Sequence, residues 1–156
     1  ELDGLSSKGH DAPYVLTIGA TNVPWLVDNA ILSRFGAKLV YVPLPDSAAR
    51  AEILGLQIDE AGHGSKVSMK ELVVKTEGYS GREIAAMCQE AITRMLRRAN
   101  PDLLAVADRG LNDLEEYELQ VAPLQAEDFE RALDRVRPGT SESYLKRLDA
   151  WRAAQE

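Results

Sequence analysis

The sequence predicts a chain in two parts: a short α/β piece, followed by an all-helical bundle. Residues 14–20 and 38–42 are short apolar runs rich in β-formers, which favour strands buried on both faces, as in parallel sheets. From residue 46 onward, apolar residues recur at the helical spacing, and polar capping residues precede the repeats. The change in pattern falls near residues 43–46, where we expect a boundary.

The first part contains two predicted strands and a short helix between them. The strand at 14–20 ends at Thr21-Asn22, and ligands of open α/β sheets gather beyond the C-terminal ends of strands. Asn22 is therefore a candidate site residue on position alone. Pro24 then breaks the strand, and residues 28–32 read as a short helix capped by Asp28.

The second part begins with three predicted helices. The first is capped by Asp46 or Ser47 and runs to about residue 61. Ser68 with Glu71, and Ser80 with Glu83, have the spacing of capping boxes at the starts of the next two. The third has an apolar stripe at helical period, and Arg94, Arg97 and Arg98 near its C-terminal end suggest a solvated terminus. The stripe consists of Ile84, Met87, Cys88, Ala91, Ile92 and Met95.

The residues after 100 predict secondary structure less uniformly. Residues 101–116 are compatible with either a turn of helix or a loop, and the apolar residues of 117–121 alternate as they would in a short strand. A fourth helix is predicted over about 125–135. Ser141 is the expected cap of a last helix, whose apolar stripe is Tyr144, Leu145, Leu148 and Trp151.

Composition limits the classes of function. The 156 residues include 18 basic and 25 acidic ones, giving a net charge of −7, so we expect no direct nucleic-acid partner. One cysteine and two histidines argue against a disulfide framework and a structural zinc site. No apolar stretch approaches the roughly 18 residues of a membrane-spanning helix. The chain opens on Glu1 with no signal-peptide pattern, as expected of a piece of a longer cytoplasmic protein.

Four segments in a fixed order carry a family resemblance. They are residues 19–24 (Gly-Ala-Thr-Asn-Val-Pro), 28–35 (Asp-Asn-Ala-Ile-Leu-Ser-Arg-Phe), 41–46 (Tyr-Val-Pro-Leu-Pro-Asp) and 78–81 (Gly-Tyr-Ser-Gly). Together they resemble the sensor-1 segment, the second region of homology, the start of the lid and the sensor-2 region of an AAA ATPase module. The residues of these segments are most similar to those of the meiotic clade, which includes katanin, spastin, the vacuolar-sorting ATPase that dismantles ESCRT-III filaments and its archaeal cell-division relative.

The resemblance implies a fold and a division of the chain. Residues 1–45 would be the C-terminal part of the large α/β subdomain, ending in the last strands of a parallel AAA+ sheet. Residues 46–140 would form the small helical lid, and residues 141–156 the C-terminal helix.

The resemblance also implies two catalytic residues. Asn22 would hold the attacking water near the γ-phosphate of ATP, although an Asn that simply ends a strand is the ordinary alternative. Arg34 would be an arginine finger that reaches the nucleotide of the neighbouring subunit. Relatives carry two or three successive arginines, whereas this sequence has Leu32-Ser33-Arg34, and an ordinary surface arginine is the alternative.

Three further residues would contact the nucleotide. Gly81, at the start of a helix, would allow close approach of the adenine and ribose. Gln57 matches a polar position near the base. Arg82 either reaches phosphate or is a solvated residue of the first helical turn.

The resemblance implies a fragment of a hexameric, ATP-driven protein-remodelling machine with ATP and Mg²⁺ as cofactors. Its partners would be identical subunits and a protein substrate, such as filament subunits. The pattern Gly-x-x-x-x-Gly-Lys-Ser/Thr is absent from the 156 residues, as is a strand ending in a Mg²⁺-binding acidic pair, so we expect this chain alone to be inactive. A non-enzymatic helical protein-interaction module is the alternative. A third possibility is that the two strands pair with another copy, because two strands alone are marginal.

Overall fold

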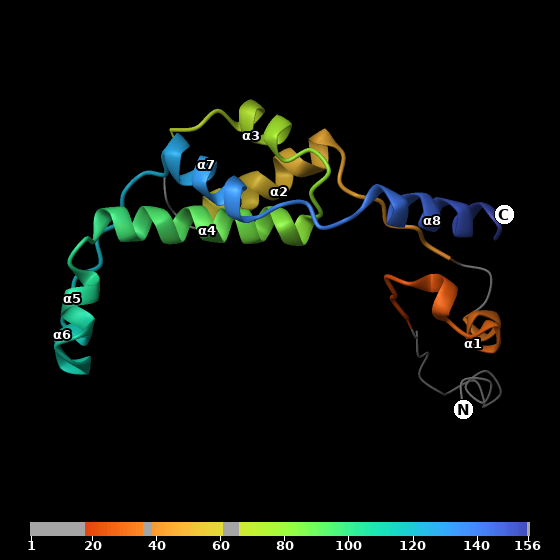
Figure 1. Ribbon diagram of the computed structural model, residues 1–156, viewed down its shortest axis with the longest axis horizontal. Helices are drawn as coiled ribbons and strands as arrows, with labels where there is room; N and C mark the ends of the chain where they lie inside the picture. Colours follow the sequence, from red (N-terminus) through yellow and green to blue (C-terminus); the bar gives the residue numbers. More distant parts are fainter. Residues whose placement is uncertain (1–17, 36–38, 61–65, 156) are drawn as a thin grey trace, which may run out of the picture. The chain divides into compact units, whose positions relative to one another are not determined.

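The computed structural model describes residues 18–35, 39–60 and 66–155 (Figure 1). The chain divides into two compact units. One unit combines the residues up to Pro43 with Ser141–Glu156, and the other is Leu44–Thr140. The C-terminal helix therefore belongs to the same unit as the N-terminal segment, although more than a hundred residues separate them in sequence.

In the unit Leu44–Thr140, the regular structure of the described residues consists of helices and an isolated bridge residue at Leu124. Helix α4 (Gly81–Ala99) packs against α2 (Ser47–Glu60) and α7 (Ala126–Arg135), and α2 packs against α3 (Met69–Lys75). Two short helices, α5 (Leu103–Ala107) and α6 (Leu111–Glu115), lie beyond the C-terminal end of α4 (Figure 1). The four packed helices form the bundle, and α5 with α6 forms an arm at its end.

The core of this unit lies along α4. The stripe predicted for this helix is confirmed: Ile92 is half-buried, and the other five residues are at most 1% exposed. Leu54 of α2, Leu72 of α3 and Phe129 of α7 pack into the same cluster. Each large apolar side chain buried in this way stabilises the folded state by about 1.5–3 kcal/mol.

The helix starts follow the predicted caps, with one exception. Ser80 and Glu83 form a complete capping box at the start of α4, and the Asp46 carboxylate accepts from the Ala49 N–H at 2.8 Å. The predicted box of Ser68 and Glu71 is wrong, because the Ser68 side chain makes no capping hydrogen bond. Spacing alone permits a capping box, but the side-chain torsions decide whether it closes.

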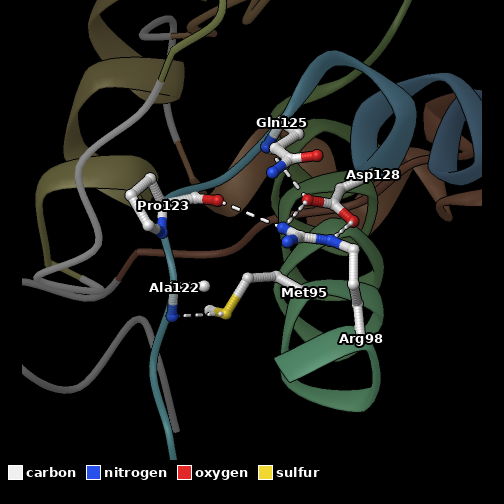
Figure 2. A network of polar contacts seen from close by, with 6 residues as sticks. All are labelled: Met95, Arg98, Ala122, Pro123, Gln125 and Asp128. Atoms are coloured by element: carbon white, nitrogen blue, oxygen red, sulfur yellow. Dashed lines mark hydrogen bonds and ion pairs between the residues drawn. The ribbon is translucent and has the colours of Figure 1, made fainter. Parts of the chain in front are cut away.

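A polar network joins the ends of α4 and α7 (Figure 2). The Arg98 guanidinium donates to both Asp128 carboxylate oxygens, at 2.8 and 3.3 Å, and to the Pro123 carbonyl at 3.1 Å. The same carboxylate accepts from the Gln125 N–H at 2.9 Å and so caps α7. The end of α4 is therefore bound to the neighbouring helix, and Arg98 forms an ion pair with Asp128 while remaining exposed.

Asn100, between α4 and α5, fixes the place where the arm begins. Its side chain is 3% exposed, and its amide and carbonyl pair with the C=O and N–H of Gln120, each at 2.8 Å. The Tyr117 hydroxyl spans Asn100 and Asp102, at 3.2 and 2.8 Å. These bonds close the chain between residues 100 and 120 into a loop, although most of its side chains are exposed.

The described residues of the first unit form a 3₁₀ turn, η2 (Pro24–Leu26), and two helices, α1 (Asn29–Arg34) and α8 (Glu142–Ala153). Asp28 caps α1 as predicted, since its carboxylate accepts from the Ala30 N–H at 2.6 Å. Ser141 likewise caps α8 by accepting from the Tyr144 N–H at 3.2 Å. Both caps were readable from sequence because each is a local contact.

The predicted strands are not observed. Residues 18–20, 39–42 and 117–121 adopt no strand, and the other residues of the first two predicted strands lie outside the described part of the chain. A strand needs a hydrogen-bonded neighbour, and the described residues supply none beside these segments. None of the described helices is both long enough and apolar enough to cross a membrane.

Candidate functional site

Asn22 is exposed in the first unit, and its main chain is held on both sides. The Thr21 hydroxyl accepts from the Val23 N–H at 3.1 Å, which forms a local turn. The Asn22 carbonyl accepts a hydrogen bond from the Tyr144 hydroxyl of α8. Among the described residues, the Asn22 side-chain amide has no hydrogen-bond partner, so its donor and acceptor are available to a ligand.

Helix α8 contacts the segment beside Asn22 through aromatic and cationic side chains. The rings of Trp25 and Tyr144 meet edge to face with centroids 5.6 Å apart, and the Arg147 guanidinium lies 4.3 Å from the Trp25 ring centroid. Further along the helix, the Arg152 guanidinium lies 5.3 Å from the ring centroid of Tyr41. Such cation–π contacts contribute about 0.5–1 kcal/mol each at exposed sites.

Tyr41 also bonds to α8 through its hydroxyl. The hydroxyl donates to the Asp149 carboxylate at 3.4 Å. Partial desolvation, followed by the negative charge of Asp149, raises the pKa of Tyr41 above its ordinary value. The two tyrosines therefore attach the N-terminal segment to α8 at two separate points.

Arg34 is the last residue of α1, and its side chain is exposed. One guanidinium nitrogen donates to the Ala30 carbonyl of the same helix at 3.1 Å. This contact is on the helix surface and requires little desolvation.

Gln57, Gly81 and Arg82 all lie in the helical unit. Gln57 is half-buried on α2, and Arg82 is exposed in the first turn of α4. A Cβ added at Gly81 would meet only the Ile53 Cδ1 atom, at an ordinary 3.6 Å. Packing therefore does not require glycine at residue 81. At Gly78, in contrast, a φ of +78° does require it.

The side chain of Glu83 fixes the loop that faces the start of α4. Its carboxylate accepts from the N–H groups of Ser80 at 2.7 Å and Gly139 at 2.6 Å. Burial alone would raise its pKa, but these hydrogen bonds outweigh burial and hold the pKa of Glu83 below its ordinary value. The N-terminus of α4 is thereby joined to the segment after α7.

Sequence reasoning missed Arg50, which holds the linker before the bundle. The residue is 9% exposed, and its guanidinium donates to the carbonyls of Pro45 at 3.0 Å and Val73 at 3.1 and 3.3 Å. It thereby ties Pro45 to the last turn of α3. No local pattern signals this role, because Val73 is more than twenty residues away in sequence.

Sequence reasoning also missed the part that Trp25, Tyr144 and Arg147 play beside Asn22. Tyr144 and Arg147 are three residues apart and share a face of α8, which is a readable pattern. Their partner Trp25 is not readable in this way. The described residues bring Asn22 and these side chains together in one unit, and Gln57, Gly81 and Arg82 into the other.

No group of histidine, cysteine, aspartate or glutamate side chains within residues 18–35, 39–60 and 66–155 could hold a metal ion. Cys88 is 1% exposed in the core, and desolvation raises its pKa to about 11. A thiol in that environment stays protonated at neutral pH and is a poor nucleophile. Cys88 is therefore a core residue, as its place on the apolar stripe predicted.

Comparisons with known families divide the helical part at residue 108. Residues 66–108 match the model of the AAA+ lid domain, and residues 108–154 match the Vps4 C terminal oligomerisation domain. The second match covers α6, α7 and α8, so it extends across both units of the fold.

Similar curated proteins are AAA ATPases. Spastin of Naegleria gruberi is 36% identical over 156 residues, covering 97% of this chain and 27% of that protein. A katanin p60 ATPase-containing protein of the A-like 1 type from Danio rerio is 34% identical over 150 residues, covering 96% of this chain and 30% of that protein. The chain thus spans less than a third of the length of the curated relatives it matches.

Solved structures that resemble this chain also include AAA domains. The FIGL-1 AAA domain is 27% identical with a TM-score of 0.74, covering 98% of this chain and 47% of that one. A structure that describes katanin self-assembly is 29% identical with a TM-score of 0.67, covering 84% of this chain and 44% of that one. The FIGL-1 AAA domain in complex with ADP is 26% identical with a TM-score of 0.69, covering 87% of this chain and 43% of that one.

Proposed function

Because this chain belongs to the AAA ATPase family and contains its lid domain and a C-terminal oligomerisation domain, we propose that it works within an ATP-driven, hexameric protein-remodelling enzyme. The observation that carries the proposal is the consecutive match to the lid and the Vps4 C-terminal oligomerisation domain across residues 66–154. The relatives named above are AAA ATPases, and their alignments cover nearly the whole of this chain, which supports the proposal.

Asn22 is the proposed sensor of the γ-phosphate. An amide can donate to a phosphate oxygen and accept from the attacking water at the same time. The unpartnered side-chain amide of Asn22, on a main chain held by neighbouring bonds, supports this role among the described residues. In the proposed reaction, Asn22 orients the water and does not itself form a bond.

Arg34 is the proposed arginine finger. Transfer of the γ-phosphoryl group leaves negative charge on its oxygens, and a guanidinium delivered by the neighbouring subunit stabilises that charge. Its exposed place at the end of α1 supports the role, because the side chain is not committed to the core. The next Arg34 around the ring would then complete each site.

Gln57, Gly81 and Arg82 are the proposed nucleotide contacts of the lid. The start of α4 offers main-chain N–H groups, and Gly81 leaves room beside them. ATP bound there would link nucleotide state to the helical bundle. The solved FIGL-1 AAA domain with ADP supports a nucleotide as the ligand.

Mg²⁺ would be held by motifs that this sequence does not contain. The described residues provide no cluster of metal ligands, and the phosphate-cradling pattern is absent from the 156 residues. Mg²⁺ supplies charge stabilisation at the β- and γ-phosphates when bound. We therefore propose that the 156-residue chain alone neither hydrolyses ATP nor binds it tightly.

ATP turnover by the full-length protein that contains this chain tests the proposed function. We expect Mg²⁺-dependent ATP hydrolysis, with loss of at least about 100-fold in kcat when Asn22→Ala removes the amide. Glu115→Ala, an exposed residue of α6, is the matched control and should retain full activity. Absence of turnover in the full-length protein would overturn the proposal and favour a non-enzymatic interaction module.

The remodelled substrate is proposed to be a protein assembly in the cytoplasm, such as a filament. The solved structure that describes katanin self-assembly supports identical subunits as ring partners. A turbidity or pelleting assay with candidate filaments, run with ATP and with a non-hydrolysable analogue, would test the substrate separately. Filaments that stay intact in the presence of ATP would contradict this part of the proposal.

A further inference from the structure

The main chain at Asn22 has two kinds of support. One is local: the Thr21 hydroxyl accepts from Val23, and η2 follows with a bond from the Leu26 N–H to the Val23 carbonyl at 3.0 Å. The other comes from far along the sequence, since the Tyr144 hydroxyl donates to the Asn22 carbonyl itself. Both bonds act on the peptide unit between Asn22 and Val23, and of the two only the bond from Tyr144 comes from outside the local turn.

Tyr144 is itself held in place. Its ring meets Trp25 edge to face at an interplanar angle of 66°, and Arg147 lies over the same indole. The Tyr144 N–H donates to the capping Ser141 hydroxyl at the start of α8. The hydroxyl therefore reaches Asn22 from a ring that packing and the helix cap both fix.

We propose that Tyr144 is a positioning residue for Asn22, which it holds through the Asn22 carbonyl in the geometry that phosphoryl transfer requires. This inference rests on the proposed function, because it assigns a task to the sensor of that reaction. Tyr144 does not touch the nucleotide. Its effect passes through one peptide carbonyl to the amide side chain three bonds away.

The physical reason is that the attacking water must be held in a narrow range of positions for the reaction to proceed. A displacement of about 1 Å at a catalytic group can lower the rate by about 100-fold, although ground-state binding is unaffected. The free side-chain amide of Asn22 is set only by its own backbone among the described residues. Loosening that backbone should therefore reduce kcat far more than it changes KM.

Tyr144→Phe in the full-length protein is the direct test. The substitution removes the hydroxyl and keeps the ring that packs against Trp25. We expect kcat for MgATP hydrolysis to fall on the order of tenfold, with KM within about twofold of wild type. Thermal unfolding and the size of the assembly, measured in parallel, should be unchanged because the packing is retained.

Tyr41→Phe is the matched control. Tyr41 also bonds to α8 through its hydroxyl, at Asp149, but it does not contact Asn22. Both variants remove one hydroxyl from the contact between α8 and the N-terminal segment. We expect Tyr41→Phe to retain wild-type kcat, which separates a specific bond to the sensor from general attachment of the helix.

A double-mutant cycle tests whether the effect passes through Asn22. In an Asn22→Ala background, Tyr144→Phe should have no further effect on the residual kcat. Amide hydrogen exchange gives a readout that is independent of activity. Exchange at the Val23 N–H, which is hydrogen-bonded to Thr21, should speed up in Tyr144→Phe and stay at the wild-type rate in Tyr41→Phe.

The outcomes separate this inference from the proposed function. Wild-type kcat in Tyr144→Phe, an equal loss in Tyr41→Phe, a loss confined to KM, or an additive loss in the Asn22→Ala background would each overturn the inference and leave an active ATPase in place. No ATPase activity in the full-length wild type would overturn the proposed function, and the inference with it.

Discussion

At the residue scale, the Asp128 carboxylate shows how much depends on one partner. Asp128 is 4% exposed and is neutralised by Arg98, whose own pKa is raised chiefly by that hydrogen bond. Removing Arg98 would leave the carboxylate buried with only the Gln125 N–H as a described partner. A buried charge without its counter-ion is costly, because water cannot replace the lost interaction.

Arg98→Ala should therefore lower the free energy of unfolding by about 1–3 kcal/mol. The matched control is Arg137→Ala, whose ion pair with Asp134 has both side chains 73% exposed and spans 3.6 Å. Exposed pairs of this kind contribute about 0–1 kcal/mol. Urea unfolding of both variants measures the contrast, and equal losses would contradict the role given to the Asp128 ion pair.

Cys88 gives a second residue-scale prediction. With its thiol buried and its pKa raised to about 11, the folded protein should not react with a thiol reagent such as DTNB at pH 8. In concentrated urea the reaction should become rapid and reach one thiol per chain, as the sequence requires. Fast labelling of the folded protein would contradict the burial of Cys88, because it would show that solvent reaches the apolar face of α4.

At the element scale, the start of α4 predicts a dependence on pH. The pKa of Glu83 lies below its ordinary value of 4.5, so its contribution to stability is present above that pH. The contribution is lost as pH falls through the lower folded-state pKa and the carboxyl takes up a proton. Glu83→Gln should therefore be less stable than wild type at pH 7, by about 1–2 kcal/mol.

The difference between wild type and Glu83→Gln should shrink as the pH falls below the ordinary pKa of 4.5 and through the lower folded-state pKa. Urea unfolding at pH 7 and pH 3.5 provides the comparison. Glu71→Gln is the control, since the predicted box at Ser68 does not form. A difference that is the same at both pH values would mean that the Glu83 charge has no part in capping.

The two glycines around Ser80 separate a structural from a functional requirement. Gly78→Ala places a side chain at a φ of +78° and should cost about 1 kcal/mol in stability. Gly81→Ala should leave stability unchanged, because its Cβ meets only Ile53 at 3.6 Å. If the start of α4 approaches the nucleotide, Gly81→Ala should weaken ATP binding by the full-length protein about tenfold.

Helices were predictable at this scale and strands were not. The stripe of α4 and the caps Asp28, Ser80 and Ser141 are local patterns, which sequence spacing records directly. A strand depends on neighbours that spacing does not specify, and residues 39–42 adopt none here. The ion pair of Arg98 with Asp128 joins residues thirty apart, which explains why sequence spacing did not predict it.

At the scale of the whole molecule, the sequence predicted the candidate residues but not what surrounds them. The resemblance of short segments to a family implies five candidate site residues, namely Asn22, Arg34, Gln57, Gly81 and Arg82. Those segments contain no information about α8, which contacts Trp25 from beyond residue 140. The contact between Tyr144 and Asn22 depends on residues more than a hundred positions apart lying in one unit.

The central claim is that this chain works in a ring whose active sites are shared between subunits. The most direct measurement is ATP turnover by the full-length protein in mixtures of Arg34→Ala and Asn22→Ala subunits, each inactive by itself, at constant total concentration. Because each Arg34 would serve the neighbouring site, an Arg34→Ala subunit beside an Asn22→Ala subunit should form a complete site, and the mixture should recover part of the wild-type activity. A mixture as inactive as either variant alone would contradict the account, since it would mean that sites are not shared between subunits.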